Sequence, residues 1–264
     1  MKCTSLFFNV LLANASLLFA YDEWSVPDLT APTVIKPIAI EVRIQHQFWG
    51  RVDGNDAFSR LFGIGDGVDA SFGFRSVVWK KAQVYASYDN TQLFGLSHNE
   101  FTTGVSYALF LPQICLRMQA DGEIFSYASL LSYPEKRKSG YFVQGCFQND
   151  PLFNRLSLLC NIGYDFDRKK PGIGFGIDAA ITESFEVYGD YFPVLDKTDA
   201  ARMHDNIQNP FSFGVKLVTP GHQFFLFISN AQENGPRHLM QGTSDNYLRL
   251  GFMLKRLFDF SKTH

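Results

Sequence analysis

The sequence predicts an all-β fold: a closed, antiparallel, up-and-down transmembrane β-barrel of about 12 strands. Three observations predict it. Apolar and polar residues alternate along many segments, these segments are long for strands, and the connections between them are alternately long and short. Because successive side chains of a strand point to opposite faces, each segment has one apolar face and one polar face.

The chain begins with a segment that predicts export. Lys2 precedes an apolar stretch that ends at Ala20 and that two Asn residues interrupt. A membrane anchor needs about 20 apolar residues, so the stretch favours a signal peptide over an anchor helix. We expect residues 1–20 to be this signal, with cleavage between 15 and 20. The remaining divisions that we expect are a periplasmic N-terminal segment (21–36), the barrel (37–260) and a short tail (261–264).

The clearest alternation lies between Ile173 and Ile181, where Phe175 shares one face with Ile177 and Asp178 lies on the other. Similar segments have about nine to thirteen residues, whereas a tilted membrane strand needs about 9–11 and strands of soluble proteins average about 5–6. The predicted strands are 37–49, 68–78, 82–90, 99–110, 114–126, 141–148, 155–166, 173–181, 185–193, 210–218, 222–230 and 246–258.

The connections between these strands give a second signal. Long ones are expected at 50–67, 91–98, 127–140, 167–172, 194–209 and 231–245. Short ones are expected at 79–81, 111–113, 149–154, 182–184 and 219–221. Loops on one rim and tight turns on the other are typical of outer-membrane barrels, and an even strand number places both chain ends on the periplasmic side.

Charged residues within the strands fall on the face opposite the apolar one. A charge that faces lipid at mid-depth costs about 2–4 kcal/mol, so these residues are predicted to line the lumen. Arg256 departs from the pattern, but it lies near the expected periplasmic end, where its side chain can reach the interface. The predicted lumen-lining residues are Glu41, Arg43, Arg75, Asp89, Arg117, Asp121, Asp165, Asp178, Glu186, Asp190, Lys216 and Arg249.

Two segments predict contacts inside the barrel. Residues 224–228 are apolar on both faces, so one face is expected to pack against something in the lumen. In the loop 50–67, Phe58, Leu61 and Phe62 share one face of a predicted short helix. This helix either folds into the barrel mouth as a plug or packs on the rim.

Several short stretches resemble a family of bacterial outer-membrane β-barrels of unknown function, whose members are exported proteins. The stretches are Gln45–Gly50 with Phe58 and 61–63, then 221–224, 229–232, 250–252 and 256–258. Gln47 and Pro220 depart from the family pattern, where Arg and Gly are common. The resemblance implies a barrel and implies no activity. The chain end also resembles the signal read by the outer-membrane assembly machinery, which closes on an aromatic residue, here Phe258 or Phe260, although the tail 261–264 extends beyond it.

The sequence offers little chemistry. It contains no phosphate loop, no GxSxG, no HExxH and no paired Cys motif. We therefore expect that the protein is not an enzyme and that it binds no metal ion and no cofactor. Two Asp-rich stretches, 53–56 and 66–69, favour turns over a calcium site. Cys115, Cys146 and Cys160 are expected to be small buried apolar residues. A net charge of −2 gives no basic field for nucleic acid.

The function that these observations favour is a passive pore or small-solute channel with a charged lumen, in the outer membrane of a gram-negative cell. The alternative is a closed barrel that serves as a scaffold or partner-binding subunit of an envelope complex. Opposed charges in the lumen leave both open, because they either pair and fill it or orient small polar solutes. The expected partners are outer-membrane lipid, the assembly machinery and, for the scaffold, an envelope protein. A soluble lipid-binding barrel would have the reverse polarity.

Overall fold

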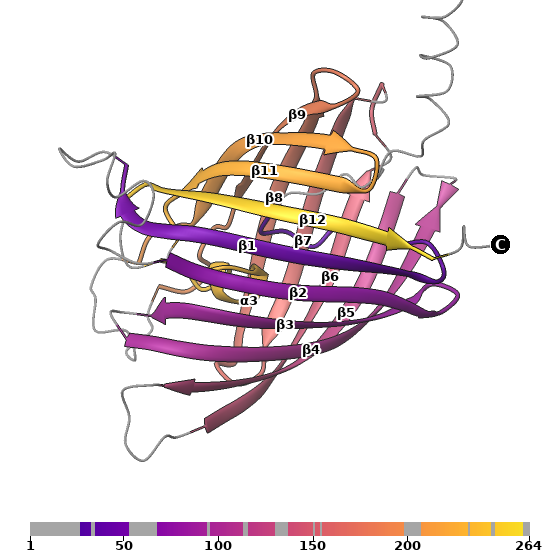
Figure 1. Ribbon diagram of the computed structural model, residues 1–264. Coiled ribbons are helices and arrows are strands. Elements are labelled where there is room, and N and C mark those ends of the chain that lie inside the picture. The colour runs from indigo at the N-terminus through magenta and orange to yellow at the C-terminus, as the bar shows by residue number, and fades with distance from the viewer. Residues whose placement is uncertain are drawn as a thin grey trace, which may run out of the picture.

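In the computed structural model, twelve antiparallel strands form one closed barrel (Figure 1). The structure describes residues 27–32, 35–52, 68–93, 96–112, 116–129, 137–149, 151–153, 155–197, 207–231, 233–243 and 246–260. The strands are β1 (Ala39–Arg51), β2 (Val68–Trp79), β3 (Ala82–Leu93), β4 (Leu96–Leu111), β5 (Leu116–Ser129), β6 (Arg137–Asn149), β7 (Leu156–Asp165), β8 (Lys170–Ala180), β9 (Phe185–Tyr191), β10 (Phe211–Thr219), β11 (His222–Ser229) and β12 (Arg249–Asp259).

Each strand pairs with its neighbours in the chain, and β1 closes the ring on β12. Gln45, for example, lies opposite Ser71 of β2 on one side and opposite Met253 of β12 on the other. Closure leaves no unpaired edge, which a bilayer would penalise by several kcal/mol per exposed backbone group. The predicted fold class is confirmed, and every predicted strand overlaps an observed one.

The largest difference in strand bounds, four residues, lies at the loop end of β6, and β4 is one of several strands that differ by three. β4 and β6 begin at Leu96 and Arg137, whereas the alternation predicted starts at 99 and 141. The additional residues of both strands are mostly polar, so they carry no period-two signal. Backbone pairing with the neighbouring strand continues there without an apolar face.

The wall of the barrel is apolar outside and largely polar inside. On β8, Phe175 and Ile177 are 45% and 46% exposed, whereas Asp178 of the same strand faces the interior and is 0% exposed. Exposed large apolar residues recur on nearly every strand, among them Phe72, Phe101, Ile124, Phe213 and Leu226. The apolar outer face of such a barrel is removed from water only when the barrel lies in a lipid bilayer. Among the described residues, no helix is long and apolar enough to cross a membrane.

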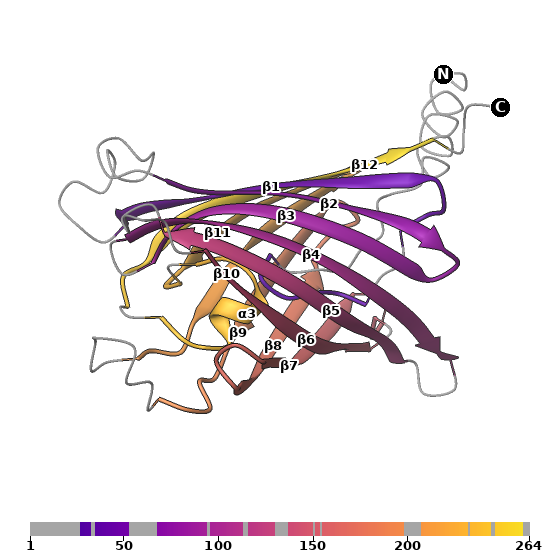
Figure 2. The same ribbon diagram turned by 90° about the horizontal axis from the view of Figure 1, so that it is seen from below.

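Two segments enter the lumen. One is the N-terminal segment (27–32), in which Asp28 and Leu29 are buried. The other is the plug loop, which joins β11 to β12, carries the helix α3 (Pro236–Leu239) and is described at 230–231, 233–243 and 246–248. Both views of the ribbon show α3 inside the ring of strands (Figures 1 and 2).

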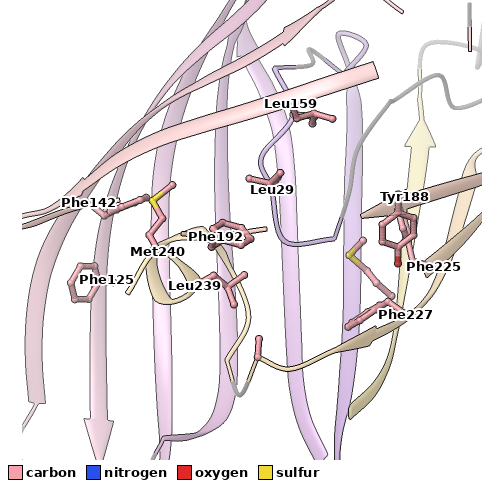
Figure 3. Close-up of a cluster of buried hydrophobic side chains, with 13 residues drawn as sticks. Leu29, Phe125, Phe142, Leu159, Tyr188, Phe192, Phe225, Phe227, Leu239 and Met240 are labelled. Carbon is pink, nitrogen blue, oxygen red and sulfur yellow. The ribbon is translucent and has the colours of Figure 1, made fainter. Parts of the chain in front are cut away.

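Apolar side chains from both inserted segments pack against the inner wall. Leu29 of the N-terminal segment and Leu239 and Met240 of the plug loop join a buried cluster with Phe142 and Phe192 (Figure 3). Glycines on β8 make room for them. A Cβ on Gly172 would overlap the side chain of Met240. A Cβ on Gly174 would lie 2.8 Å from Leu29 Cδ2.

The inserts change one of the expectations from the sequence and confirm another. Residues 27–32 belong to the stretch expected in the periplasm, yet they lie inside the barrel, because the small inner face of β8 leaves space there. The predicted plug helix with Phe58, Leu61 and Phe62 lies outside the described residues. The prediction for 224–228 is confirmed, since Phe225 and Phe227 are buried inside and Phe225 contacts the ring of Tyr188 edge-on.

We predict that Gly172→Ala loosens the plug loop and lowers the free energy of unfolding by about 1–3 kcal/mol, the usual cost of overpacking. The added methyl would overlap Met240, so α3 must shift. Urea titration of the folded, heat-shifted gel band measures the change. Gly122→Ala on β5 is the matched control, because a Cβ there meets nothing within 4 Å. Equal midpoints for the two variants would contradict the packing role of Gly172.

Candidate functional site

The candidate site is a cavity of about 160 Å³ inside the barrel. The inner faces of β1 to β5 form one side of it, and the N-terminal segment and α3 form the other. The plug loop and the N-terminal segment therefore occupy part of the lumen and leave this space beside the strands. The cavity is a part of the interior where a small molecule has room.

Charged side chains of both signs line the cavity. The acidic ones are Asp28, Glu41, Asp89, Glu100, Asp121 and Glu123. The basic ones are Arg43, Arg75, Arg237 and Lys255, with His238 beside them. On the wall of β1 and β2, Arg75 Nη2 donates to Glu41 Oε2 over 2.8 Å. The cavity is thus polar, and carboxylates outnumber the permanent cations around it.

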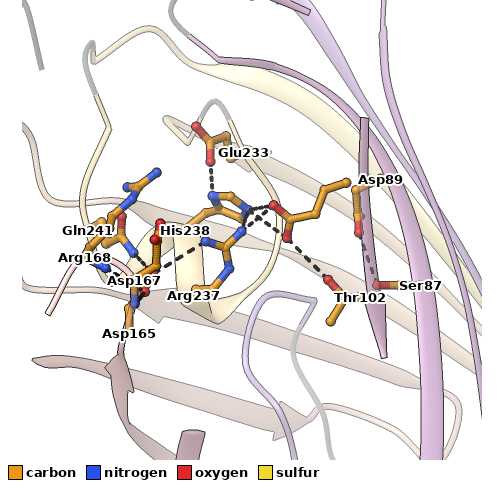
Figure 4. A network of polar contacts seen from close by, with 11 residues as sticks. Ser87, Asp89, Thr102, Asp165, Asp167, Arg168, Glu233, Arg237, His238 and Gln241 are labelled. Carbon is orange, nitrogen blue, oxygen red and sulfur yellow. Dashed lines mark hydrogen bonds and ion pairs between the residues drawn. The ribbon is translucent and has the colours of Figure 1, made fainter. Parts of the chain in front are cut away.

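Arg237 of α3 connects the plug loop to two different strands (Figure 4). Its guanidinium forms an ion pair with Glu100 of β4, and its Nη1 lies 3.5 Å from Asp165 Oδ2 of β7. The guanidinium carbon also lies 3.7 Å from the ring centroid of Phe125. Gln241 of the plug loop donates to the same Asp165 oxygen over 2.8 Å. These contacts hold α3 between the two walls.

His238 adds a titratable group to this network. Its ring contacts Glu233 of the plug loop and lies 3.3 Å from Glu100 Oε2. Burial and the neighbouring Arg237 guanidinium lower the pKa of His238, whereas the carboxylates of Glu233 and Glu100 raise it. The two carboxylates prevail, and the pKa of His238 lies at about 9.

Asn230 fixes the start of the plug loop. Its side-chain oxygen accepts a hydrogen bond from Phe211 N at 2.8 Å, and its Nδ2 donates to Asn209 O at 3.1 Å. Gln208 and Thr243 exchange two backbone hydrogen bonds of 2.8 and 3.0 Å. The plug loop is therefore attached by backbone pairing to the residues that precede β10.

A second buried network consists of residues that do not line the cavity. Lys216 of β10 forms ion pairs with Asp178 of β8 and Glu186 of β9, and its side chain is fully buried. The ammonium group also lies 5.7 Å from the ring centroid of Phe225. The network thus pairs one ammonium group with two carboxylates on the two preceding strands, away from the residues that line the cavity.

The structure places the sequence-predicted residues in several groups. Glu41, Arg43, Arg75, Asp89 and Asp121 line the cavity. Asp165 anchors the plug loop. The second network consists of Asp178, Glu186 and Lys216. Asp190 accepts a hydrogen bond from Ser212 Oγ at 2.6 Å. Arg249 donates to Asn230 O at 3.4 Å, and Arg117 lies at the short-turn end of β5, 5.8 Å from the Phe110 ring centroid.

Sequence reasoning missed the residues that the plug loop brings inside. Arg237 and His238 lie in the segment 231–245, which the sequence predicts to be a loop outside the barrel wall. Glu100 and Glu123 are not among the predicted lumen-lining residues. The one available signal was the stretch Ser229–Gln232, which stood out as part of the resemblance, and which includes the Asn230 anchor. Cys146 and Cys160 are free thiols, and Cys146 is buried as expected.

Comparison with known proteins agrees with this architecture. A family described as a membrane-bound β-barrel domain, DUF5777, matches residues 161–258, from β7 to β12. No curated protein matches the chain. The resemblance of the chain to an uncharacterised family of bacterial barrels is confirmed over this part.

Solved structures of outer-membrane barrels share the fold. A KdgM porin in complex with disordered oligogalacturonate is 11% identical, covers 84% of this chain and 99% of its own, and has a TM-score of 0.51. The outer-membrane protein Omp33 of Acinetobacter baumannii is 8% identical over 84% of this chain and 100% of its own, with a TM-score of 0.48. Phospholipase A of Escherichia coli is 11% identical over 93% and 96%, with a TM-score of 0.47. The chain is an outer-membrane β-barrel, and its fold is similar to that of the KdgM porin.

We predict that Arg237→Met destabilises the barrel by about 3–5 kcal/mol, because it leaves Glu100 and Asp165 buried without their shared cation. Urea unfolding of the single and double variants measures the effect. Adding Glu100→Gln to Arg237→Met should recover part of the loss, since it removes a buried carboxylate that keeps only the His238 ring as a cationic partner. If the double variant is less stable than Arg237→Met alone, the ion pair does not account for the loss.

We also predict a pH-dependent contribution of His238 to stability. A folded pKa of about 9 exceeds the ordinary value of 6.5. The stabilisation is therefore fully present below pH 6.5 and is lost as the pH rises through 9. The difference in urea midpoint between wild type and His238→Gln should shrink across this interval. A difference that stays constant from pH 6 to 10 would show that His238 acts through packing alone.

Proposed function

We propose that the chain is an outer-membrane channel for small polar solutes, that it carries out no chemistry on them, and that the plug loop gates it. The observation that carries this proposal is the charged cavity between β1–β5 and the inserts. An apolar barrel exterior with a charged interior is the arrangement by which pores bring polar solutes across lipid.

The attachment of the plug loop supports a gating role. Gln47 Nε2 donates to Ala231 O over 2.7 Å, and Gln45 Nε2 donates to Asn234 Oδ1 over 3.0 Å. Together with the ion pairs of Arg237, these polar contacts can be exchanged for contacts with water when the loop moves. A net contribution of about 0.5–1.5 kcal/mol per hydrogen bond allows such a rearrangement without unfolding the wall.

Bilayer recording of a chain with a locked plug loop tests this function. Gln208 and Thr243 form a hydrogen-bonded antiparallel pair, whose Cα atoms lie about 5.5 Å apart, within the range of a disulfide. We expect unit conductance steps for wild type, loss of these steps for oxidised Gln208→Cys/Thr243→Cys, and their return after reduction. Gln208→Cys alone is the control and should conduct under both conditions.

Two outcomes would overturn this proposal at different levels. Equal conductance of the oxidised and reduced double variant would remove the gating role of the plug loop and leave the pore. Silence of wild type and of Arg237→Met at all voltages would remove the pore itself.

A closed scaffold is the second candidate, and the filling of the lumen favours it. The inserts bury Leu29 and Met240, and Lys216 forms ion pairs with two carboxylates in the interior. A scaffold would be silent in the bilayer and would be recovered from mild detergent with a stoichiometric envelope protein. A lone, conducting monomer would contradict it.

A further inference from the structure

Two carboxylates of β5 face the cavity without an ion-pair contact among the described residues, although Arg75 and Arg237 lie near enough to interact with them through space. Asp121 and Glu123 lie on the same face of the strand, and both line the cavity. The hydroxyl of Tyr85 donates to Glu123 Oε1 over 2.9 Å. Gln119 Nε2 donates to Asp121 Oδ1 over 2.7 Å. Within the part of the chain that the structure describes, neither carboxylate takes part in an ion pair.

The other donors to Asp121 are neutral as well. Gln144 Nε2 lies 3.1 Å and Cys146 Sγ lies 3.4 Å from Asp121 Oδ2. Glu41 and Glu100 of the same cavity, by contrast, each have an arginine partner. Asp121 is buried and Glu123 is half-buried. Two neighbouring carboxylates in such a place repel each other and lose hydration, which is costly unless a positive charge compensates them.

Gln119 gives an independent indication of a ligand. Its side chain is 5% exposed and lines the cavity beside Asp121. Its Oε1 accepts no hydrogen bond from any described residue. A buried acceptor of this kind calls for a donor, and leaving it unpaired costs about 1–3 kcal/mol. A ligand that donates hydrogen bonds and carries positive charge would satisfy Gln119 and the two carboxylates together.

The size and the remaining surface of the cavity indicate an organic cation. A volume of about 160 Å³ is close to that of a cavity that holds benzene, about 150 Å³. Leu29 and Ala31 of the N-terminal segment supply apolar surface to the same cavity. No group of three His, Cys, Asp or Glu among the described residues is arranged to hold a metal ion.

We infer that the cavity binds a small organic cation, whose primary ammonium group is held by Asp121, Glu123 and the side-chain oxygen of Gln119. Three N–H donors of an ammonium match these three acceptors. The alkyl part of the ligand lies toward Leu29 and Ala31. As the solute class of the channel, this inference rests on the proposed function, whereas binding itself does not depend on conduction.

Gly104 and Tyr85 shape the acidic wall of this site. A Cβ on Gly104 of β4 would overlap the ring of Tyr85, so only glycine lets this ring cross β4 and reach Glu123 on β5. Tyr85 is therefore a positioning residue, which orients Glu123 toward the cavity.

Calorimetric titration of the full barrel in detergent at pH 8 tests the inference. The probes are n-butylammonium, n-butanol and butyrate, which share an alkyl chain and differ in charge. We expect saturable binding of n-butylammonium and binding at least about tenfold weaker for the other two. Equal binding of n-butanol, binding of butyrate in preference, or no binding of n-butylammonium would overturn the inference.

The variant Asp121→Asn/Glu123→Gln should lose at least about tenfold in affinity for n-butylammonium. It should fold, because it removes two charges that repel each other, and the heat-shifted gel band verifies this. Asp167→Asn/Glu183→Gln is the matched control, since it removes two exposed carboxylates outside the cavity. Unchanged affinity of the cavity variant, or an equal loss in the control, would contradict the assigned site.

A second variant tests the same site if the double variant fails to fold. Tyr85→Phe removes the hydrogen bond to Glu123 but keeps the ring over Gly104, so it should weaken n-butylammonium binding and leave the unfolding midpoint near that of wild type. Unchanged affinity would count against the site. Silence in bilayer recordings together with saturable binding would refute the channel and leave the cation site standing.

Discussion

The whole structure depends on one constraint: no backbone hydrogen-bonding group of the wall can be left unpaired in lipid. The pairing of β1 with β12 meets it, because it joins the two ends of the sheet and removes both edges. Once the ring is closed, each strand has one face toward lipid and one toward the interior. Phe175 and Asp178, three residues apart on β8, show how strictly the two faces differ.

Closure creates an interior that must then be filled or hydrated. In this barrel, two segments and three kinds of contact share that task. Glycines of β8 admit Leu29 and Met240, ion pairs of Arg237 hold α3 between β4 and β7, and Asn230 anchors the loop. The inserts fill only part of the interior, and the cavity is what remains. Its wall is polar because the inner faces of β1 to β5 form it.

The fold could be predicted from the sequence, because period-two patterns such as 173–181 report directly on a wall with two different sides. The same pattern selected charges such as Asp178 and Lys216, whose side chains are buried. The inserts could not be predicted this way. Arg237 and His238 lie in a loop without periodicity, and their burial depends on long-range contacts to Glu100 and Asp165. Asp28 likewise precedes the barrel in the chain, and nothing local shows that its segment turns inward.

The connectivity of the inserts has a consequence for biogenesis. The N-terminal segment precedes β1, and the plug loop immediately precedes β12, so both are tethered to the two strands that meet at the seam. These strands are separated by nearly the full length of the chain, and such distant contacts form late because of their large loop-closure entropy. We therefore expect the two segments to enter the interior in the same late step in which β1 pairs with β12, so that a closed barrel without the inserts does not form first.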